Sequence, residues 1–275
     1  MAFRTSIYKT PDELRLMVAP GLATLASLDA VREAIRPGVT TLELDSIADA
    51  AIRALGGRSN FQMVPGYRHT ICASVNENVV HGIPDDRPLE PGDIVSIDSG
   101  ADVGGWSGDS AITVVVPGAS PAMSGPRHHL SDVTEASLWH GIARLASAKH
   151  LNEVGAAIEE YIDSQGEFGI LTDYIGHGIG RSMHEDPPVY NYRVRAKGPA
   201  VRPGLVVAIE PMVTSGSIDT LTLDDDWTVA TADGSMSAHW EHSVAVHAGG
   251  IWVLTAADGG ASKLAPLGVR PVPIS

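Results

Sequence analysis

The sequence predicts an α+β fold made of two similar halves related by a pseudo-twofold axis. Segments with helix start signals are interspersed with β-rich runs along the chain. Residues 93–116 hold two β-rich runs on either side of a Gly-Gly pair, which is typical of an antiparallel hairpin. A short pattern in residues 91–98 recurs in residues 203–210. The repeat favours one domain built from two αβ halves over two separate domains.

The composition is that of a globular protein without a nucleic-acid partner. The 275 residues carry a net charge of −14, with a pI of about 5.1, whereas phosphate binding requires a basic face. We find no apolar run of the roughly 18–20 residues that span a membrane, and no signal-peptide core at the start. The single cysteine, Cys72, excludes an internal disulfide. We therefore expect a cytoplasmic protein that contacts neither membranes nor nucleic acid.

Capping signals define the first helices. Thr10-Pro-Asp-Glu13 can form a capping box with proline at the first helical position, and Pro20 predicts a kink or break near Leu16. A second capping box, Thr40-Thr-Leu-Glu43, opens a helix whose apolar face we expect to contain Leu44, Ile47, Ala51 and Leu55. Further along the chain, we predict a loop over residues 117–126 and helices over about 131–147 and 152–165.

Two aspartates lie on the predicted hairpin. If the chain turns near Val103-Gly104, Asp98 and Asp109 face each other, with Cβ atoms about 4.5–5.5 Å apart. Two buried carboxylates this close repel each other and need a compensating charge, usually a divalent cation. The hairpin alone also allows two solvated aspartates on a surface.

The rest of the chain supplies more groups of the same kind. The repeat ends in Asp98 in its first copy and in Glu210 in its second. His177 lies between glycines, which let other groups approach it closely, and Glu241 lies within a predicted strand over residues 237–246. Four carboxylates and one imidazole suit Mn, Fe(II), Co or Zn. Four acids are too many for one ion, but they suit two ions about 3.5–4 Å apart.

The words around these residues resemble the methionine aminopeptidase family in its bacterial type I form. They are Cys72-Ala-Ser-Val-Asn-Glu, His81-Gly-Ile-Pro-Asp-Asp, Ile97-Asp-Ser-Gly, Gly108-Asp-Ser, Gly176-His-Gly-Ile-Gly, Met183-His-Glu-Asp-Pro, Ile209-Glu-Pro-Met and Trp240-Glu-His-Ser. The resemblance runs from about residue 10 to about residue 255. It implies a pita-bread fold, a pseudo-twofold curved antiparallel sheet with helices on its outer face. The chain would then be a single catalytic domain with halves of about 10–116 and 130–255.

The resemblance also implies an activity and a cofactor. The activity is removal of the initiator methionine from nascent proteins and peptides, by attack of a metal-bridging water on the first peptide bond. The cofactor is two divalent ions per chain, of Co, Mn, Fe(II) or Zn. One ion would be held by Asp109, His177, Glu210 and Glu241, and the other by Asp98 with Asp109 and Glu241 bridging. We expect a monomer that works close to the ribosome.

The same resemblance assigns further roles in the site. Glu210 would shuttle a proton, His184 would donate a hydrogen bond to the scissile carbonyl, and His81 would contact the scissile amide nitrogen. The methionine pocket would be lined by Tyr67, Cys72, Met183 and Trp227, with His81 and His184 also contacting the substrate.

Two other functions fit part of the pattern. Prolidases and aminopeptidases P share the five ligands, but they usually carry a large N-terminal domain, whereas the first helix here begins near Thr10. A metal-free binding protein on the same scaffold is the second alternative. Such relatives lose ligands, and all five are present in this chain.

Overall fold

The computed structural model describes residues 6–275. Its helices are α1 (Pro11–Leu16), α2 (Val18–Ala34), α3 (Thr41–Ala54), α4 (Pro121–Leu145), α5 (Glu153–Gln165) and α6 (Ala261–Leu264), with 3-10 helices η1 (Phe61–Met63) and η2 (Ala265–Leu267). Its strands are β1 (Arg58–Ser59), β2 (Ile71–Val75), β3 (Asn78–Val80), β4 (Ile94–Val103), β5 (Trp106–Val115), β6 (Gly169–Ile170), β7 (Gly176–Gly178), β8 (Glu185–Val189), β9 (Val206–Ile209), β10 (Met212–Thr214), β11 (Thr220–Thr222), β12 (Val229–Thr231), β13 (Ser237–His239), β14 (His242–His247) and β15 (Gly250–Val253).

The first helices follow their capping signals. Thr10 and Thr40 each form the predicted capping box, with Glu13 and Glu43 respectively. The break predicted near Leu16 is confirmed, because α1 ends at Leu16 and α2 begins at Val18. The predicted apolar face of α3 is partly wrong, since Leu55 is 51% exposed. The buried face of α3 consists of Thr41, Leu44, Ala48 and Ile52.

The α1–α2 segment is apolar on average, although the sequence contains no unbroken apolar run of membrane-spanning length there. By length and mean hydropathy, Pro11–Ala34 could cross a membrane. Half of its most apolar window, however, is buried inside the fold, and α2 packs against β4 and β5. A helix that covers a sheet in a globular core has the same composition.

The strands of residues 6–275 form four antiparallel sheets. β4 pairs with β1 and β2 on one side and β5 on the other, and the order of the largest sheet is β15-β14-β9-β7-β8. Two smaller sheets have the orders β13-β10-β6 and β11-β12-β3. The two copies of the sequence repeat therefore provide the central strands β4 and β9 of two different sheets.

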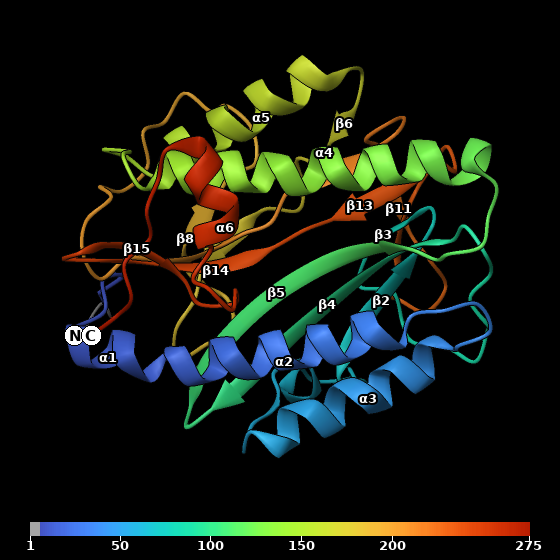
Figure 1. The fold of residues 1–275 in the computed structure, drawn as a ribbon, viewed down its shortest axis with the longest axis horizontal. Helices are drawn as coiled ribbons and strands as arrows, with labels where there is room; N and C mark the ends of the chain where they lie inside the picture. The colour runs from blue at the N-terminus through green and yellow to red at the C-terminus, as the bar shows by residue number, and fades with distance from the viewer. Residues whose placement is uncertain (1–5) are drawn as a thin grey trace.

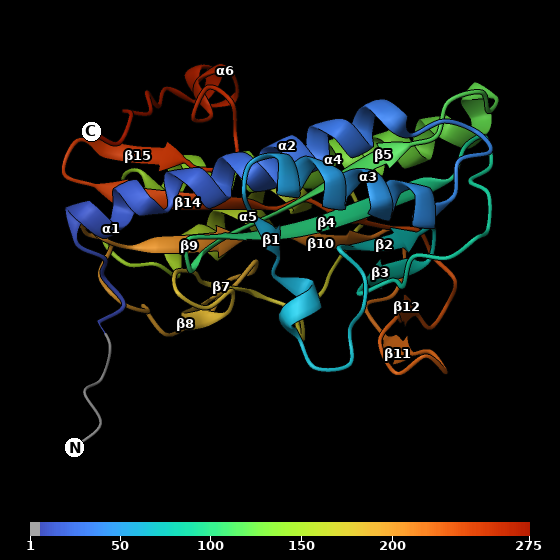
Figure 2. The same ribbon diagram turned by 90° about the horizontal axis from the view of Figure 1, so that it is seen from below.

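The helices lie on one side of these sheets. Figures 1 and 2 show α2, α3 and α4 across one side, while β7, β8, η1 and the β11–β12 hairpin lie on the opposite side. Two large clusters of buried apolar residues occupy the space between helices and strands, one under α2 and α3 and one under α4 and α5. Trp240 packs against both clusters.

The prediction of a loop over residues 117–126 is wrong in its second part. Helix α4 already begins at Pro121, five residues before Pro126 in the chain. Proline suits the first position of a helix because its missing N–H group has no partner there. Contacts with Gly92 also hold this end, since the Arg127 guanidinium donates a hydrogen bond to the Gly92 carbonyl. The helix that was predicted to begin near residue 131 therefore begins ten residues earlier, at Pro121.

Candidate metal centre and substrate pocket

The β4–β5 hairpin places Asp98 and Asp109 on one face, but not directly opposite each other. Asp98 pairs with Ala111, and Asp109 pairs with Gly100. The predicted register is therefore wrong by two residues. The turn is Gly104-Gly105, with φ of +63° and +78°, and a two-residue turn of this type needs positive φ at both positions. Because side chains alternate with a period of two, the shift leaves both carboxylates on the same face.

Gly100 makes room for one of these carboxylates. A Cβ atom on Gly100 would lie 3.2 Å from Oδ1 of Asp109 and 3.2 Å from Cε1 of Phe61. The carboxylate of Asp109 therefore occupies space that any other residue at position 100 would partly fill.

The second half of the chain delivers the other three predicted ligands. His177 is the middle residue of β7 and pairs with Ala208 of β9. Glu210 follows directly after β9, and its backbone carbonyl accepts a hydrogen bond of 3.0 Å from Nδ2 of Asn191. Glu241 lies between β13 and β14, so the strand predicted over residues 237–246 is interrupted next to its carboxylate.

Backbone contacts bring the two halves together at these ligands. The N–H group of Glu241 donates to the carbonyl of Ala111 over 3.0 Å, and Ala111 N–H donates back over 3.4 Å. The Ser243 hydroxyl accepts a hydrogen bond from the backbone N–H of Asp109 and donates to the carbonyl of Asp109, over 3.1 and 2.7 Å. The predicted ligands Asp109 and Glu241 are therefore held next to each other by backbone contacts between distant parts of the chain.

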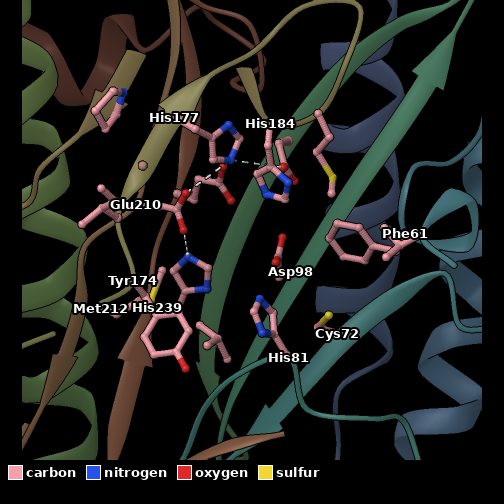
Figure 3. Close-up of a pocket in the computed structure, with 18 of the residues that line it drawn as sticks. Phe61, Cys72, His81, Asp98, Tyr174, His177, His184, Glu210, Met212 and His239 are labelled. Atoms are coloured by element: carbon pink, nitrogen blue, oxygen red, sulfur yellow. Dashed lines mark ion pairs between the residues drawn. The ribbon is translucent and has the colours of Figure 1, made fainter. Parts of the chain in front are cut away.

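The five predicted ligands line one cavity, and Figure 3 shows three of them, Asp98, His177 and Glu210. Nε2 of His177 lies 3.4 Å from Oε1 of Glu210 and 3.8 Å from Oδ2 of Asp109. Ligand atoms lie within 4.8 Å of one another in two groups that share Glu241, namely His177, Glu210, Glu241 and Asp98, Asp109, Glu241. A third such group joins Asp109 and His177 to His184.

Burial changes the protonation of this cluster. It raises the pKa of all four carboxyl groups, to about 7 for Asp98. Repulsion between the carboxylates adds to this effect for Asp109, Glu210 and Glu241. Burial lowers the pKa of His177 to about 4, with a further contribution from His184, so the imidazole is neutral at pH 7. A neutral imidazole is the form that binds a metal ion.

Unpartnered oxygens provide a test of whether these residues fit metal ions. Oδ1 of Asp98, Oδ1 of Asp109 and Oε1 of Glu241 are buried, and none of them has a hydrogen-bond partner within residues 6–275. Buried carboxylate oxygens are costly without a partner unless they bind a cation. The donor set of oxygens with one imidazole suits a hard or borderline divalent ion. The residues therefore fit two ions, one at each group.

Two further histidines border the same cavity. The rings of His177 and His184 lie edge to face, with centroids 4.4 Å apart. His81 has a φ of +58°, which is unusual for a residue other than glycine. Partial burial lowers the pKa of both His81 and His184 below the usual range of histidine. Both are therefore neutral at pH 7, and each has one N–H group that can donate.

A cavity of about 610 Å³ opens beside the carboxylates. Its wall includes all of the predicted pocket residues, Tyr67, Cys72, His81, Met183, His184 and Trp227. The Tyr67 hydroxyl lies 2.7 Å from the carbonyl of Ile71 and 3.2 Å from Sγ of Cys72, and its ring packs against Trp227 with centroids 5.1 Å apart. Burial raises the pKa of the Cys72 thiol, which is thus protonated at pH 7.

The acidic stretch at residues 224–226 supports this wall. The carboxylate of Asp225 accepts hydrogen bonds from the backbone N–H groups of Trp227 and Thr228, over 2.8 and 2.7 Å. It therefore fixes the turn that carries the Trp227 ring.

The structure adds residues that the sequence did not single out. Phe61, Tyr174, Met212 and His239 also line the cavity (Figure 3). His239 is buried, and its Nε2 lies 3.7 Å from Oε2 of Glu210. One signal was present, because His239 precedes Glu241 by two residues in a predicted strand, and such residues face the same side.

Comparison with known proteins agrees with this geometry. The family model of metallopeptidase family M24 matches residues 16–248. Methionine aminopeptidase 1 of Bacillus subtilis is 42% identical over 249 residues, which cover 90% of this chain and 98% of that protein. Methionine aminopeptidase 1 of Mycobacterium tuberculosis is 46% identical over 253 residues, which cover 90% of this chain and 94% of that protein.

Solved structures of methionine aminopeptidases resemble this chain more closely than those of prolidases do. The methionine aminopeptidase of Thermotoga maritima superposes with a TM-score of 0.84 at 36% identity, covering 90% of this chain and 98% of that one. The prolidase of Pyrococcus furiosus reaches 0.66 at 20% identity, and the match covers 91% of this chain but 65% of that one. The prolidase thus shares the fold alone. The predicted α+β pita-bread fold is confirmed, and the chain belongs to metallopeptidase family M24 and, within it, to the methionine aminopeptidases.

Proposed function

We propose that this chain removes the N-terminal methionine from nascent proteins and peptides as a dinuclear metallo-aminopeptidase. One observation carries the proposal. Asp98, Asp109 and Glu241 each have a buried carboxylate oxygen without a hydrogen-bond partner among residues 6–275, and ligand atoms of the three residues lie within 4.8 Å of one another. The three residues line a cavity whose wall also includes aromatic and sulfur-containing side chains. The cluster suits hydrolysis, and the wall suits a flexible thioether side chain.

In this proposal, Asp109, His177, Glu210 and Glu241 would hold one ion, and Asp98, Asp109 and Glu241 would hold the other. The groups His177–Glu210–Glu241 and Asp98–Asp109–Glu241, whose ligand atoms lie within 4.8 Å of one another, support this division. When bound, such ions would act as Lewis acids and would lower the pKa of a water molecule at the site. Co, Mn, Fe(II) and Zn all suit this donor set, and cellular supply rather than affinity decides which of them is used.

The protein's own groups bind the substrate and move the protons. The carboxylate of Glu210 accepts the proton of the attacking water and passes it to the leaving amine. The imidazole of His184 donates a hydrogen bond to the oxygen of the scissile carbonyl, where negative charge develops. His81 contacts the scissile amide nitrogen and helps the leaving group to depart.

The side chain of the substrate methionine occupies the cavity between Tyr67, Cys72, Met183 and Trp227, with His81 and His184 beside its backbone. The Tyr67–Trp227 contact and the Asp225 turn hold the aromatic part of this wall in place. The wall is therefore preorganised for an apolar side chain, which limits the ordering cost of binding.

The remaining assignments concern the setting of the enzyme. We propose a single catalytic domain whose halves, about 10–116 and 130–255, meet at the Glu241–Ala111 contact and around Trp240. We further propose a cytoplasmic monomer that acts on nascent chains near the ribosome. The net charge of −14 argues against direct contact with nucleic acid.

The decisive experiment follows release of free methionine from Met-Ala-Ser. The protein is treated with a chelator, and Mn, Co, Fe(II) or Zn is then added back. We expect activity to vanish on chelation and return with metal, together with about two ions per chain by mass spectrometry of the metals. Cleavage of Xaa-Pro substrates in place of Met-Ala-Ser would instead indicate a prolidase or aminopeptidase P. A folded protein that binds no metal would indicate a binding scaffold.

A further inference from the structure

The loop that carries Met183 and His184 has little regular structure of its own. It connects β7 to β8 over residues 179–184, and at its base Gly178 pairs with Glu185. Within the loop, the N–H group of Gly180 donates to the carbonyl of Ser182 over 3.1 Å. The positions of Met183 and His184 therefore depend on contacts with other parts of the chain.

One of these contacts is an ion pair with the N-terminal segment. Nζ of Lys9 lies 2.6 Å from Oε2 of Glu185, and the Lys9 side chain is only 6% exposed. The other carboxylate oxygen, Oε1, accepts a hydrogen bond of 3.0 Å from the N–H group of Ser182. Glu185 thus joins Lys9 on one side to the backbone of the loop on the other.

Lys9 is itself fixed to the body of the protein. Its N–H group donates to the carbonyl of Gly204 over 2.7 Å, and the preceding Tyr8 forms a bridge with Leu205. These partners lie just before β9, the strand that leads to Glu210. The start of β9 therefore supports both the loop, through Lys9, and the carboxylate cluster, through Glu210.

The fit around the ion pair leaves little room for adjustment. A Cβ atom on Gly180 would lie 2.6 Å from Cε of Lys9 and 2.8 Å from Oε1 of Glu185. The tip of the β4–β5 hairpin holds the other side of the loop, because Ser107 N–H donates to Gly180 over 2.8 Å and the Arg181 guanidinium lies 4.2 Å above the Trp106 ring. Lys9 is almost fully buried and Glu185 is partly buried, so losing the charge of either residue leaves the other poorly compensated.

We infer that Lys9 is a positioning residue for the hydrolytic reaction, which acts through Glu185 to hold His184 and Met183 in place. This inference rests on the proposed function, in which His184 donates to the scissile carbonyl. Glu185 lines the cavity, whereas Lys9 is not among the described residues that do so. Through Lys9, the N-terminal segment would therefore influence kcat.

The kinetic test compares Lys9→Met, Lys9→Arg and Glu185→Gln with the wild type. We expect Lys9→Met to lower kcat on Met-Ala-Ser by about tenfold or more, with full metal content, because a small misplacement of a catalytic group costs this much. Lys9→Arg keeps the charge and should restore part of the rate. In a protein that already carries Glu185→Gln or His184→Ala, Lys9→Met should cause little further loss of kcat. The reason is that Lys9 is proposed to act through these two residues.

Arg53→Met provides the matched control. Arg53 forms an ion pair of the same 2.6 Å length with Asp49, but on the exposed side of α3. Neutralising Arg53 should leave kcat unchanged.

A second test observes the loop directly and does not depend on activity. Trypsin cleaves after arginine, and Arg181 is an exposed residue of the loop. We expect brief trypsin treatment to cut Lys9→Met and Glu185→Gln between Arg181 and Ser182 faster than it cuts the wild type or Arg53→Met.

The two tests distinguish the possible failures. An active wild type whose Lys9→Met and Glu185→Gln variants show normal kcat and normal cleavage would overturn the positioning role and keep the proposed function. A folded, metal-loaded wild type that releases no methionine would overturn the proposed function, while faster cleavage of the variants would still support the contact between Lys9 and the loop. If Lys9→Met does not fold, Glu185→Gln and Lys9→Arg provide the same comparison.

Discussion

The backbones of Ala111 and Glu241 exchange two hydrogen bonds, with N···O distances of 3.0 and 3.4 Å, although they belong to different halves of the chain. Ala111 is also the residue that pairs with Asp98 in the hairpin. The contact therefore sets the carboxylate of Glu241 beside those of Asp98 and Asp109. The proposed centre therefore combines residues from distant segments of the chain, and the position of each carboxylate depends on the contacts between these segments.

Asp109→Asn should remove both metal and activity. Asp109 belongs to the Asp98–Glu241 group and lies 3.8 Å from His177, so its charge serves both proposed ions. We expect metal content to fall towards zero after mild dialysis and methionine release to fall by at least about a thousandfold. An Asp109→Asn protein with full metal content and a normal rate would contradict the site.

His184→Ala should separate turnover from metal binding. His184 lies beside His177, but its proposed role is to donate a hydrogen bond to the scissile carbonyl. Loss of one such donor typically lowers kcat by about a hundredfold to a thousandfold. Metal content should stay at the wild-type value. Loss of metal from His184→Ala would instead make His184 a ligand, as its group with Asp109 and His177 allows.

Asp98→Asn should change the pH dependence of stability in the metal-free protein. Burial raises the pKa of Asp98 to about 7 from a usual value of 3.8, so ionisation costs the folded state more than the unfolded state. The wild type thus loses stability as pH rises between these two values, whereas the variant has no carboxyl group to ionise there.

Urea unfolding with chelator measures this difference. Because one pKa unit is worth about 1.4 kcal/mol, Asp98→Asn should gain on the order of 3 kcal/mol over the wild type between about pH 5 and about pH 8. The same stability difference between variant and wild type at both pH values would show that Asp98 ionises freely. Adding metal should reverse the order, because the bound cations then stabilise the ionised wild type.

Gly100→Ala should impair the site without touching a ligand. The added Cβ would lie 3.2 Å from Oδ1 of Asp109, which is closer than most carbon contacts and would displace the carboxylate. We expect metal affinity to fall by about tenfold. Gly125→Ala is the matched control, because a Cβ there meets no described atom within 4 Å beyond its neighbours in the chain and the backbone of its own helix. Equal metal affinities in the two variants would refute the crowding argument.

Cys72 should react slowly with thiol reagents at neutral pH. Its location in the cavity suggests a target for covalent inhibition, but burial raises the pKa of the thiol, and the thiolate is the reactive form. Alkylation measured by mass spectrometry should accelerate with rising pH and should be suppressed by methionine. Inactivation of Cys72→Ser at the wild-type rate would show that another group reacts.

The five ligand candidates that the sequence singled out lie around one cavity, whereas part of their local geometry was predicted wrongly. Motif words located all five ligand candidates, and both capping boxes formed as expected, because each depends on residues close together in the chain. The hairpin register was wrong because the turn was centred one residue too early, although Gly104-Gly105 is the pair that a turn with two positive φ values prefers.

Other errors arose where distant contacts decide. The start of α4 depends on contacts with Gly92 from another part of the chain, which local composition cannot show. His239 joins the cavity because β13 ends just before Glu241 and directs its ring at Glu210. The spacing of two residues from Glu241 placed His239 on the same side of the predicted strand, but it could not show that the ring lies next to Glu210.

The contact between Ala111 and Glu241 also has a consequence for the order in which the site forms during synthesis of this protein. Asp98 and Asp109 leave the ribosome first, and Glu241 is the last of the five ligand candidates to follow. Until Glu241 pairs with Ala111, an emerging copy carries a repelling pair of acids with an incomplete set of ligands. Each copy should therefore acquire hydrolytic capacity in one late step, when the second half closes on the first.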